Sequence, residues 1–209
     1  FCSLGSALLF YYFFQQPINT VGIEVIDFFL NYKLISIIFT LLCIIFLTQA
    51  FNIIDGLNGL SLMSCILSLT SIVLISHDIG ETIFYKNSLI LMSVLFGVFF
   101  INFPLGKIFI GDCGAYLIGF FLAIILILFY ENNNIHSLVI AQIVIYPSYE
   151  LIRSFSRRLI KKNVKIMEPD FMHFHSLLYS FNIRKFSKSS LFCNNITSLQ
   201  ILILQFINL

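Results

Sequence analysis

Polar side chains that could bind a cation or a phosphate occur at separate places in this apolar chain. Asn52 and Asp55 are three residues apart, so on a helix they share one face. Asp112 stands at the start of a long apolar segment, and Lys107 precedes it by five residues. Mg²⁺ binds a few carboxylate oxygens together with substrate phosphates, so Asp112 is a candidate Mg²⁺ ligand and Lys107 a candidate phosphate contact.

Each carboxylate also has a purely structural interpretation. Asp55-Gly56 and Asn58-Gly59 are typical turn sequences, so Asp55 could simply end one helix before the next begins. A carboxylate at the start of a helix is often an N-cap, which is the alternative for Asp112. The local pattern leaves both interpretations open.

A third polar group lies in a basic segment near the end of the chain, where Asp170, His173 and His175 follow one another closely. Zn²⁺ normally needs more nitrogen or sulfur ligands than this segment offers. Phosphate contacts by histidine and arginine fit the basic surroundings better, and a structural role for the histidines is the alternative. Glu150 precedes Arg153 by three residues, which predicts an ion pair between them on one helix.

The elements that must position these residues are membrane helices. Hydrophobic residues make up 59% of the 209 residues and charged residues only 11%, against about 25% charged in soluble domains. This composition excludes a soluble enzyme, a disordered segment and a disulfide scaffold. It predicts an all-α bundle with about seven membrane spans. The predicted spans are residues 1–14, 34–54, 57–76, 88–103, 113–130, 137–155 and 191–209.

The loops between these spans differ in charge. One set, residues 15–33, 77–87 and 131–136, holds two of the 12 basic residues, whereas the other set, with Arg153 at a span end, holds the remaining ten. The positive-inside rule places the second set in the cytoplasm. Residues 20–30 in the first outer loop partly alternate in polarity and are β-branched, which favours a short hairpin.

The chain is predicted to be one domain, residues 1–209, with a cytoplasmic loop at about 156–190. It begins with Phe1 inside an apolar stretch that lacks the basic start and cleavage site of a signal peptide. We therefore expect an N-terminally truncated membrane protein.

Three motifs together resemble the polyprenyl-phosphate N-acetylhexosamine-1-phosphate transferase family, also called the glycosyltransferase 4 family. They are AFNIIDGLNGL at residues 50–60, Asn102 followed by IFIGDCGAYLIGF at 108–120, and RRLIKK with PDFMHFHS at 157–176. The resemblance implies an integral membrane enzyme of the bacterial plasma membrane with its site facing the cytoplasm. It further implies transfer of a sugar-1-phosphate from a UDP-amino sugar to undecaprenyl phosphate, with release of UMP. Such a reaction starts the synthesis of cell-surface glycans such as O antigen, capsule or wall polymers.

The resemblance also implies roles for individual residues. Asp112 and Asp55 match the carboxylates at the Mg²⁺ ion, where Mn²⁺ is a substitute. His173 and His175 match a His-x-His loop that binds the diphosphate and amino sugar, so these four residues are predicted to be catalytic. The predicted substrate-binding residues are Asn52, Asn102, Lys107, Asp170, Arg157 and Arg158.

Three departures from the family pattern bear on these expectations. Asn58 stands where many members have Asp, and Ser176 replaces a histidine that is common in the phospho-muramoyl-pentapeptide branch. The family's Asp-Asp pair has no counterpart here, because no acidic residue precedes Glu24. We expect that pair upstream of Phe1.

The alternatives are an inactive relative and, less favoured, a membrane transporter, for which neither mid-membrane polar groups nor a repeat is visible. The expected partners are the UDP-amino sugar, undecaprenyl phosphate and the lipid bilayer. A homodimer is left open, and no nucleic acid is expected.

Overall fold

A computed structural model describes residues 16–160, 172–186 and 189–208, together with residues 5, 7, 8, 11 and 12. Every regular element in this part of the chain is a helix, which confirms the all-α class. The helices are α2 (Glu24–Leu30), α3 (Lys33–Ile54), α4 (Leu60–Ile79), α5 (Thr82–Asn102), α6 (Gly111–Asn133), α7 (Ser137–Ile143), α8 (Ile145–Ile160), α9 (Phe174–Phe186) and α10 (Ser190–Ile207).

Within the described residues, the helices α3, α4, α5, α6 and α10 are each long and apolar enough to cross a membrane. They correspond to the predicted spans at 34–54, 57–76, 88–103, 113–130 and 191–209. The predicted span at 1–14 falls largely outside the described residues. Many large apolar side chains on these helices are exposed, among them Val94 and Phe100 on α5. Such an outward apolar surface suits lipid as the solvent, so the chain is a multi-pass membrane protein.

The predicted span at 137–155 is wrong as a single helix, because the chain breaks it into α7 and α8 at Val144. Pro147 explains the break: it has no N–H for the carbonyl of Ile143, and its ring would clash with that carbonyl in a continuous helix. The hydroxyl of Ser68 on α4 donates to the Ile143 oxygen instead, at 2.9 Å. Neither half is among the candidate spans.

The predicted hairpin at 20–30 is also wrong, because Glu24–Leu30 in this stretch form the short helix α2. The carboxylate of Asp27 accepts hydrogen bonds from the N–H groups of Val21 and Gly22, at 2.6 and 3.1 Å, just before this helix begins. A side chain that accepts hydrogen bonds from nearby backbone N–H groups favours a turn and the start of a helix over strand pairing. The alternation of polar and apolar residues does not reveal such side-chain bonds.

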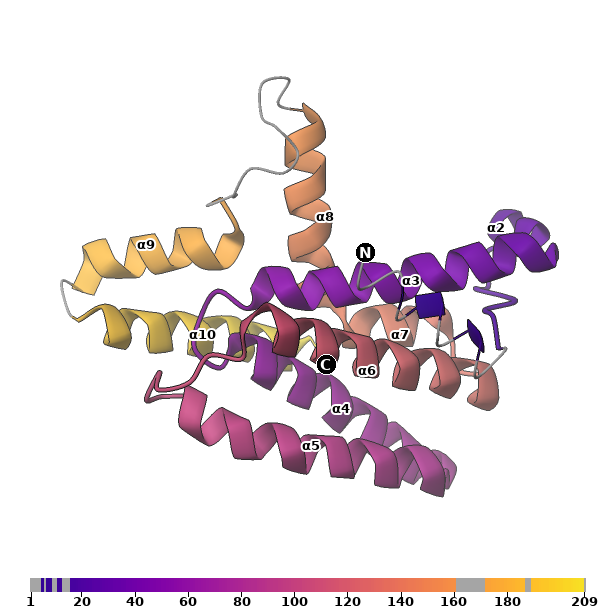
Figure 1. Cartoon of the computed structure of the whole chain (residues 1–209), viewed down its shortest axis with the longest axis horizontal. Coiled ribbons are helices and arrows are strands. Elements are labelled where there is room, and N and C mark those ends of the chain that lie inside the picture. Colours follow the sequence, from indigo (N-terminus) through magenta and orange to yellow (C-terminus); the bar gives the residue numbers. More distant parts are fainter. Residues whose placement is uncertain are drawn as a thin grey trace.

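The helices α3 and α6 pack against each other along their lengths, and α4 pairs in the same way with α5 (Figure 1). Gly119 on α6 permits the first of these contacts, since a side chain there would meet the Thr48 Cα atom of α3 at 2.9 Å. Small residues allow close helix approach in membranes in this way. The helix α8 also contacts α3 but stands out steeply from the bundle in Figure 1.

Candidate active site

The helix α3 ends at a turn that carries Asp55. Asp55 is the C-cap of α3, and its N–H bonds the Asn52 carbonyl oxygen at 3.3 Å. Gly59 in the same turn has φ +72, a left-handed conformation that favours glycine. The structural interpretation of this motif as a helix end and turn is therefore confirmed. It does not exclude a role in a site, because the Asp55 side chain is only half-buried.

Asp112 lies in the first turn of α6, beside the end of α3. The N-cap of α6 is Ile110, and no side chain caps the helix, so the N-cap interpretation of Asp112 is wrong. Instead its Oδ1 atom accepts a hydrogen bond from the Asn52 Nδ2 atom at 3.1 Å. Residues 60 positions apart thus meet, and the N-terminus of a helix is an electrostatically favourable place for a carboxylate.

The Asp55 carboxyl is electrostatically coupled to Asp112. Partial burial raises the pKa of Asp55, and the negative charge of Asp112 raises it further, to about 7. Two carboxylates that disfavour each other's charge are typical of a place where a cation or a proton is held between them. Asp55 and Asp112 thus form a paired-carboxylate centre, whose binding of a cation stays a prediction.

The His-x-His segment reaches this centre from the other end of the chain. A side chain added at Gly56 would lie 2.8 Å from the Nε2 atom of His175, so the imidazole rests directly against the turn that follows Asp55. The rings of His173 and His175 are stacked, with centroids 5.3 Å apart and planes 4° from parallel. Both histidines therefore lie beside the turn that follows Asp55, and their catalytic role stays a prediction.

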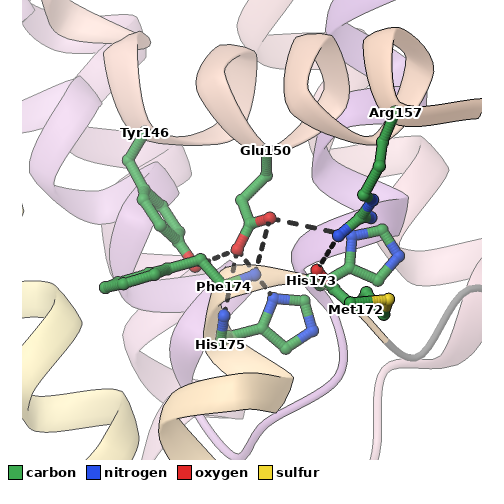
Figure 2. Close-up of polar contacts among 7 residues, drawn as sticks. All are labelled: Tyr146, Glu150, Arg157, Met172, His173, Phe174 and His175. Atoms are coloured by element: carbon green, nitrogen blue, oxygen red, sulfur yellow. Dashed lines mark hydrogen bonds and ion pairs between the residues drawn. The ribbon is translucent and has the colours of Figure 1, made fainter. Parts of the chain in front are cut away.

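Glu150 on α8 is the residue that sequence reasoning missed. Its buried carboxylate contacts His173, Phe174 and His175 at the start of α9, and it also accepts a hydrogen bond from the Tyr146 hydroxyl at 3.3 Å (Figure 2). These contacts replace the predicted ion pair with Arg153. The sequence did contain one signal of a buried polar contact: Tyr146 precedes Glu150 by four residues, one helical turn, in a segment otherwise rich in apolar residues.

Asn102 holds the site's loops together. Its Oδ1 atom accepts from the Gly59 N–H in the α3–α4 turn, and its Nδ2 atom donates to the Ile108 oxygen at 2.5 Å in the loop before Asp112. It is almost fully buried, at 4% exposure. Asn102 therefore bridges the two loops that carry the carboxylates, and its predicted contact with a nucleotide stays a prediction.

The start of α10 supports the same loops. The Oδ1 atom of Asn194 accepts from the Asn58 N–H at 2.8 Å, and Asn195 donates to the Pro104 oxygen at 2.8 Å. These two asparagines lie near the start of the predicted span at 191–209. Their role is to satisfy backbone groups of the loops beneath the site.

The other predicted residues differ in their exposure. Lys107 is exposed in the loop before α6. Arg157 and Arg158 lie half-buried in the last turn of α8, and Arg157 donates to the Met172 carbonyl oxygen next to His173. Asp170 falls outside the described residues.

The chemistry of the donors suits a hard divalent cation. Within the described residues no group of three or more histidine, cysteine or acidic side chains is close enough to hold a metal ion by itself. The paired carboxylates of Asp55 and Asp112 offer oxygen ligands, and Mg²⁺ commonly uses one or two carboxylates together with substrate phosphates and waters. Cys113 is a soft donor that does not suit this ion. The residues present therefore fit Mg²⁺.

Comparison with known families agrees with this arrangement of membrane helices around two carboxylates. The model of glycosyl transferase family 4 matches residues 1–130, more than half of the chain, and the chain belongs to this family. The match includes Asn52, Asp55 and Asp112, whereas His173 and His175 lie beyond it.

Individual relatives are named as sugar-phosphate transferases. The chain is 32% identical over 146 residues, 69% of its length, to a probable undecaprenyl-phosphate N-acetylglucosaminyl 1-phosphate transferase of Bacillus subtilis. It is 29% identical over 139 residues, 66% of its length, to an undecaprenyl-phosphate alpha-N-acetylglucosaminyl 1-phosphate transferase of Thermotoga maritima. It is 29% identical over 122 residues, 58% of its length, to a phospho-N-acetylmuramoyl-pentapeptide-transferase of Streptococcus agalactiae. The matches cover 40%, 41% and 36% of these relatives.

Proposed function

We propose that this protein transfers N-acetylhexosamine-1-phosphate from a UDP-sugar to undecaprenyl phosphate and releases UMP. An oxygen of the acceptor phosphate attacks the β-phosphorus of the UDP-sugar, and the bond from that phosphorus to the oxygen of UMP breaks. The observation that carries the proposal is that the end of α3, with Asp55, is joined to Asp112 by the Asn52 hydrogen bond and lies against His175 at Gly56. Membership of the family and the names of the relatives support it.

Phosphoryl transfer of this kind needs negative charge to be neutralised at the reacting phosphorus. Asp55 and Asp112 would hold Mg²⁺, and Asn52 orients the Asp112 carboxylate through its hydrogen bond. When bound, the ion would neutralise charge on the diphosphate. Lys107, Arg157 and Arg158 add positive charge near the same end, and the imidazoles of His173 and His175 face the diphosphate and amino sugar.

A cavity of about 460 Å³ lies between α3, α6 and α7 and suits the prenyl chain of the acceptor. Its walls are apolar side chains such as Phe39, Phe46, Leu126 and Ile140. The lining covers Phe39–Leu47 of α3 and Ala123–Tyr130 of α6, toward the ends of these helices away from Asp55 and Asp112. A prenyl chain that fills the cavity and continues along the remaining turns of α3 and α6 would present its phosphate at the carboxylates. Basic residues gather at that end of the described helices, so we assign the site to the cytoplasmic face of the bacterial plasma membrane.

The test uses membranes that contain the protein expressed from its complete gene. They are supplied with undecaprenyl phosphate, Mg²⁺ and either UDP-N-acetylglucosamine or UDP-muramoyl-pentapeptide. We expect UMP release and a lipid-linked sugar from UDP-N-acetylglucosamine, and neither product in the presence of EDTA. In Asp112→Asn we expect the rate of UMP release to fall by roughly 100-fold or more. The control Asp78→Asn lies on the outer side and should retain activity.

Absence of UMP release from a folded, membrane-inserted protein would overturn the proposal in favour of an inactive relative. Equal rates in Asp112→Asn and the unaltered protein would refute the assigned site. If UMP were released only when UDP-muramoyl-pentapeptide is supplied, that compound would be the sugar donor.

A further inference from the structure

Glu150 is a fully buried carboxylate at the junction of α8 and α9. Its exposure is 0%, and its oxygens accept the backbone N–H groups of Phe174 and His175, each at 3.1 Å. These N–H groups open α9 and have no partners within that helix. A buried carboxylate is costly unless it is paired, so the contacts around Glu150 explain how it is tolerated.

The same carboxylate faces both imidazoles. The Nδ1 atom of His175 lies 3.1 Å from its Oε1 atom, and the Nδ1 atom of His173 lies 3.7 Å from its Oε2 atom, which is ion-pair but not hydrogen-bond distance. Burial alone disfavours the charged carboxylate, but the contacts with His173 and His175 outweigh it and hold the pKa of Glu150 well below its usual range. An ionised carboxylate only accepts hydrogen bonds, so the proton of the shared bond belongs to Nδ1 of His175.

The Nε2 atoms point away from Glu150, and that of His175 lies against Gly56 in the turn after Asp55. We propose that Glu150 is a positioning residue that fixes the Nδ1–H tautomer of His175 and the stacked orientation of His173, so that the Nε2 atoms face the active site. The hydrogen bond at one ring nitrogen determines the state of the other. The kinetic test of this role rests on the proposed function, whereas the spectroscopic test does not.

A purely structural role of Glu150, as a cap of α9, makes a different prediction. A cap stabilises the helix whether or not the imidazoles are present. A positioning residue acts through the imidazoles, so its effect on catalysis disappears when they are removed. The two roles can therefore be separated by combining substitutions.

The kinetic experiment compares Glu150→Gln alone and in a His175→Ala background, in membranes of the protein expressed from its complete gene. Alone, we expect a loss of roughly 10- to 100-fold in kcat/KM, the size of loss seen when residues that orient metal-ligating histidines are replaced. In the His175→Ala background the further loss should be below about threefold, because the two residues act as a unit. Equal losses in both backgrounds would overturn the proposal. The control Glu131→Gln makes the same change at the outer end of α6 and should retain activity.

The spectroscopic experiment uses purified protein in detergent with ¹⁵N-labelled histidine. This chain has four histidines, and His175→Ala assigns the signal of interest. We expect His175, when neutral, to carry its proton on Nδ1 in the unaltered protein and in Tyr146→Phe, and a mixture of tautomers in Glu150→Gln. An unchanged tautomer in Glu150→Gln would refute the proposal even if no transferase activity were found.

If Glu150→Gln does not fold, Glu150→Asp keeps the charge but shortens the side chain by one methylene group. The shorter residue cannot reach both imidazoles and the start of α9 together. We expect Glu150→Asp to lower kcat/KM and to give a mixture of His175 tautomers, as Glu150→Gln does. An unchanged kcat/KM together with a single tautomer would overturn the proposal.

Discussion

At the scale of single residues, the contact between Gly56 and His175 joins two motifs that are more than 100 positions apart. The sequence identified both motifs and interpreted Asp55-Gly56 as a turn. It did not reveal that the His175 imidazole lies against this turn, because no spacing rule relates a turn after one helix to a loop before another. The role of Glu150 was missed for the same reason, since its partners other than Tyr146 lie at the start of α9.

Gly56→Ala tests this contact. The added methyl group would lie 2.8 Å from the His175 Nε2 atom, and His175 cannot easily withdraw because Glu150 holds its other nitrogen. We expect kcat/KM to fall by about 10- to 100-fold, since small displacements of catalytic groups have effects of this size. The thermal midpoint in detergent should change little.

Gly97→Ala is the matched control for this substitution. No atom of the described part of the chain lies within 4 Å of a side chain added at Gly97 in α5, so activity should be retained. Alanine favours a helix interior by up to about 1 kcal/mol over glycine, so stability should be equal or higher. Equal kinetic losses in both variants would contradict the assigned contact.

At the scale of elements, the long apolar helices were easier to predict than the connections between them. Apolar length located α3, α6 and α10 because the cost of placing each residue in lipid depends mainly on its own side chain. The break between α7 and α8 was missed, although Pro147 is visible in the sequence. Whether a proline bends or divides a membrane helix depends on a partner for the released carbonyl, and here that partner is Ser68 on another helix.

Asn102→Ala tests how the connecting loops are held. The substitution removes the acceptor of the Gly59 N–H and the donor to the Ile108 oxygen, which leaves buried backbone groups unpaired. We expect the free energy of unfolding in detergent to fall by about 1–3 kcal/mol, with a loss of activity as the carboxylate loops shift.

Asn132→Ala serves as the comparison. Among the residues that the structure describes, Asn132 donates only to the Leu128 oxygen of its own helix, at 2.7 Å, near the end of α6 away from Asp112. Its removal should leave both stability and activity nearly unchanged. If Asn102→Ala behaved in the same way, Asn102 would have no bridging role.

At the scale of the whole molecule, the membrane orientation can be tested by cysteine labelling in a Cys113→Ser background. Lys107 lies in the loop before α6. Asp78 lies in the last turn of α4, at the other end of this helix from the turn that carries Asp55. We expect Lys107→Cys to react with an impermeant maleimide only in inside-out vesicles, and Asp78→Cys only in right-side-out vesicles. Reaction of both from the same side would contradict the alternating topology.

The sequence by itself determined the class of molecule: a membrane-spanning bundle, its basic side, and the residue types that could bind a cation and phosphates. These features follow from properties that can be read from one segment at a time, namely the length of each apolar stretch and the charge of each loop. Only the tertiary structure decided that Asp55, Asp112 and His175 meet, that Asn102 bridges loops, and that Glu150 holds the imidazoles. Such contacts depend on how helices pack and turn relative to one another, which residue spacing along one segment does not specify.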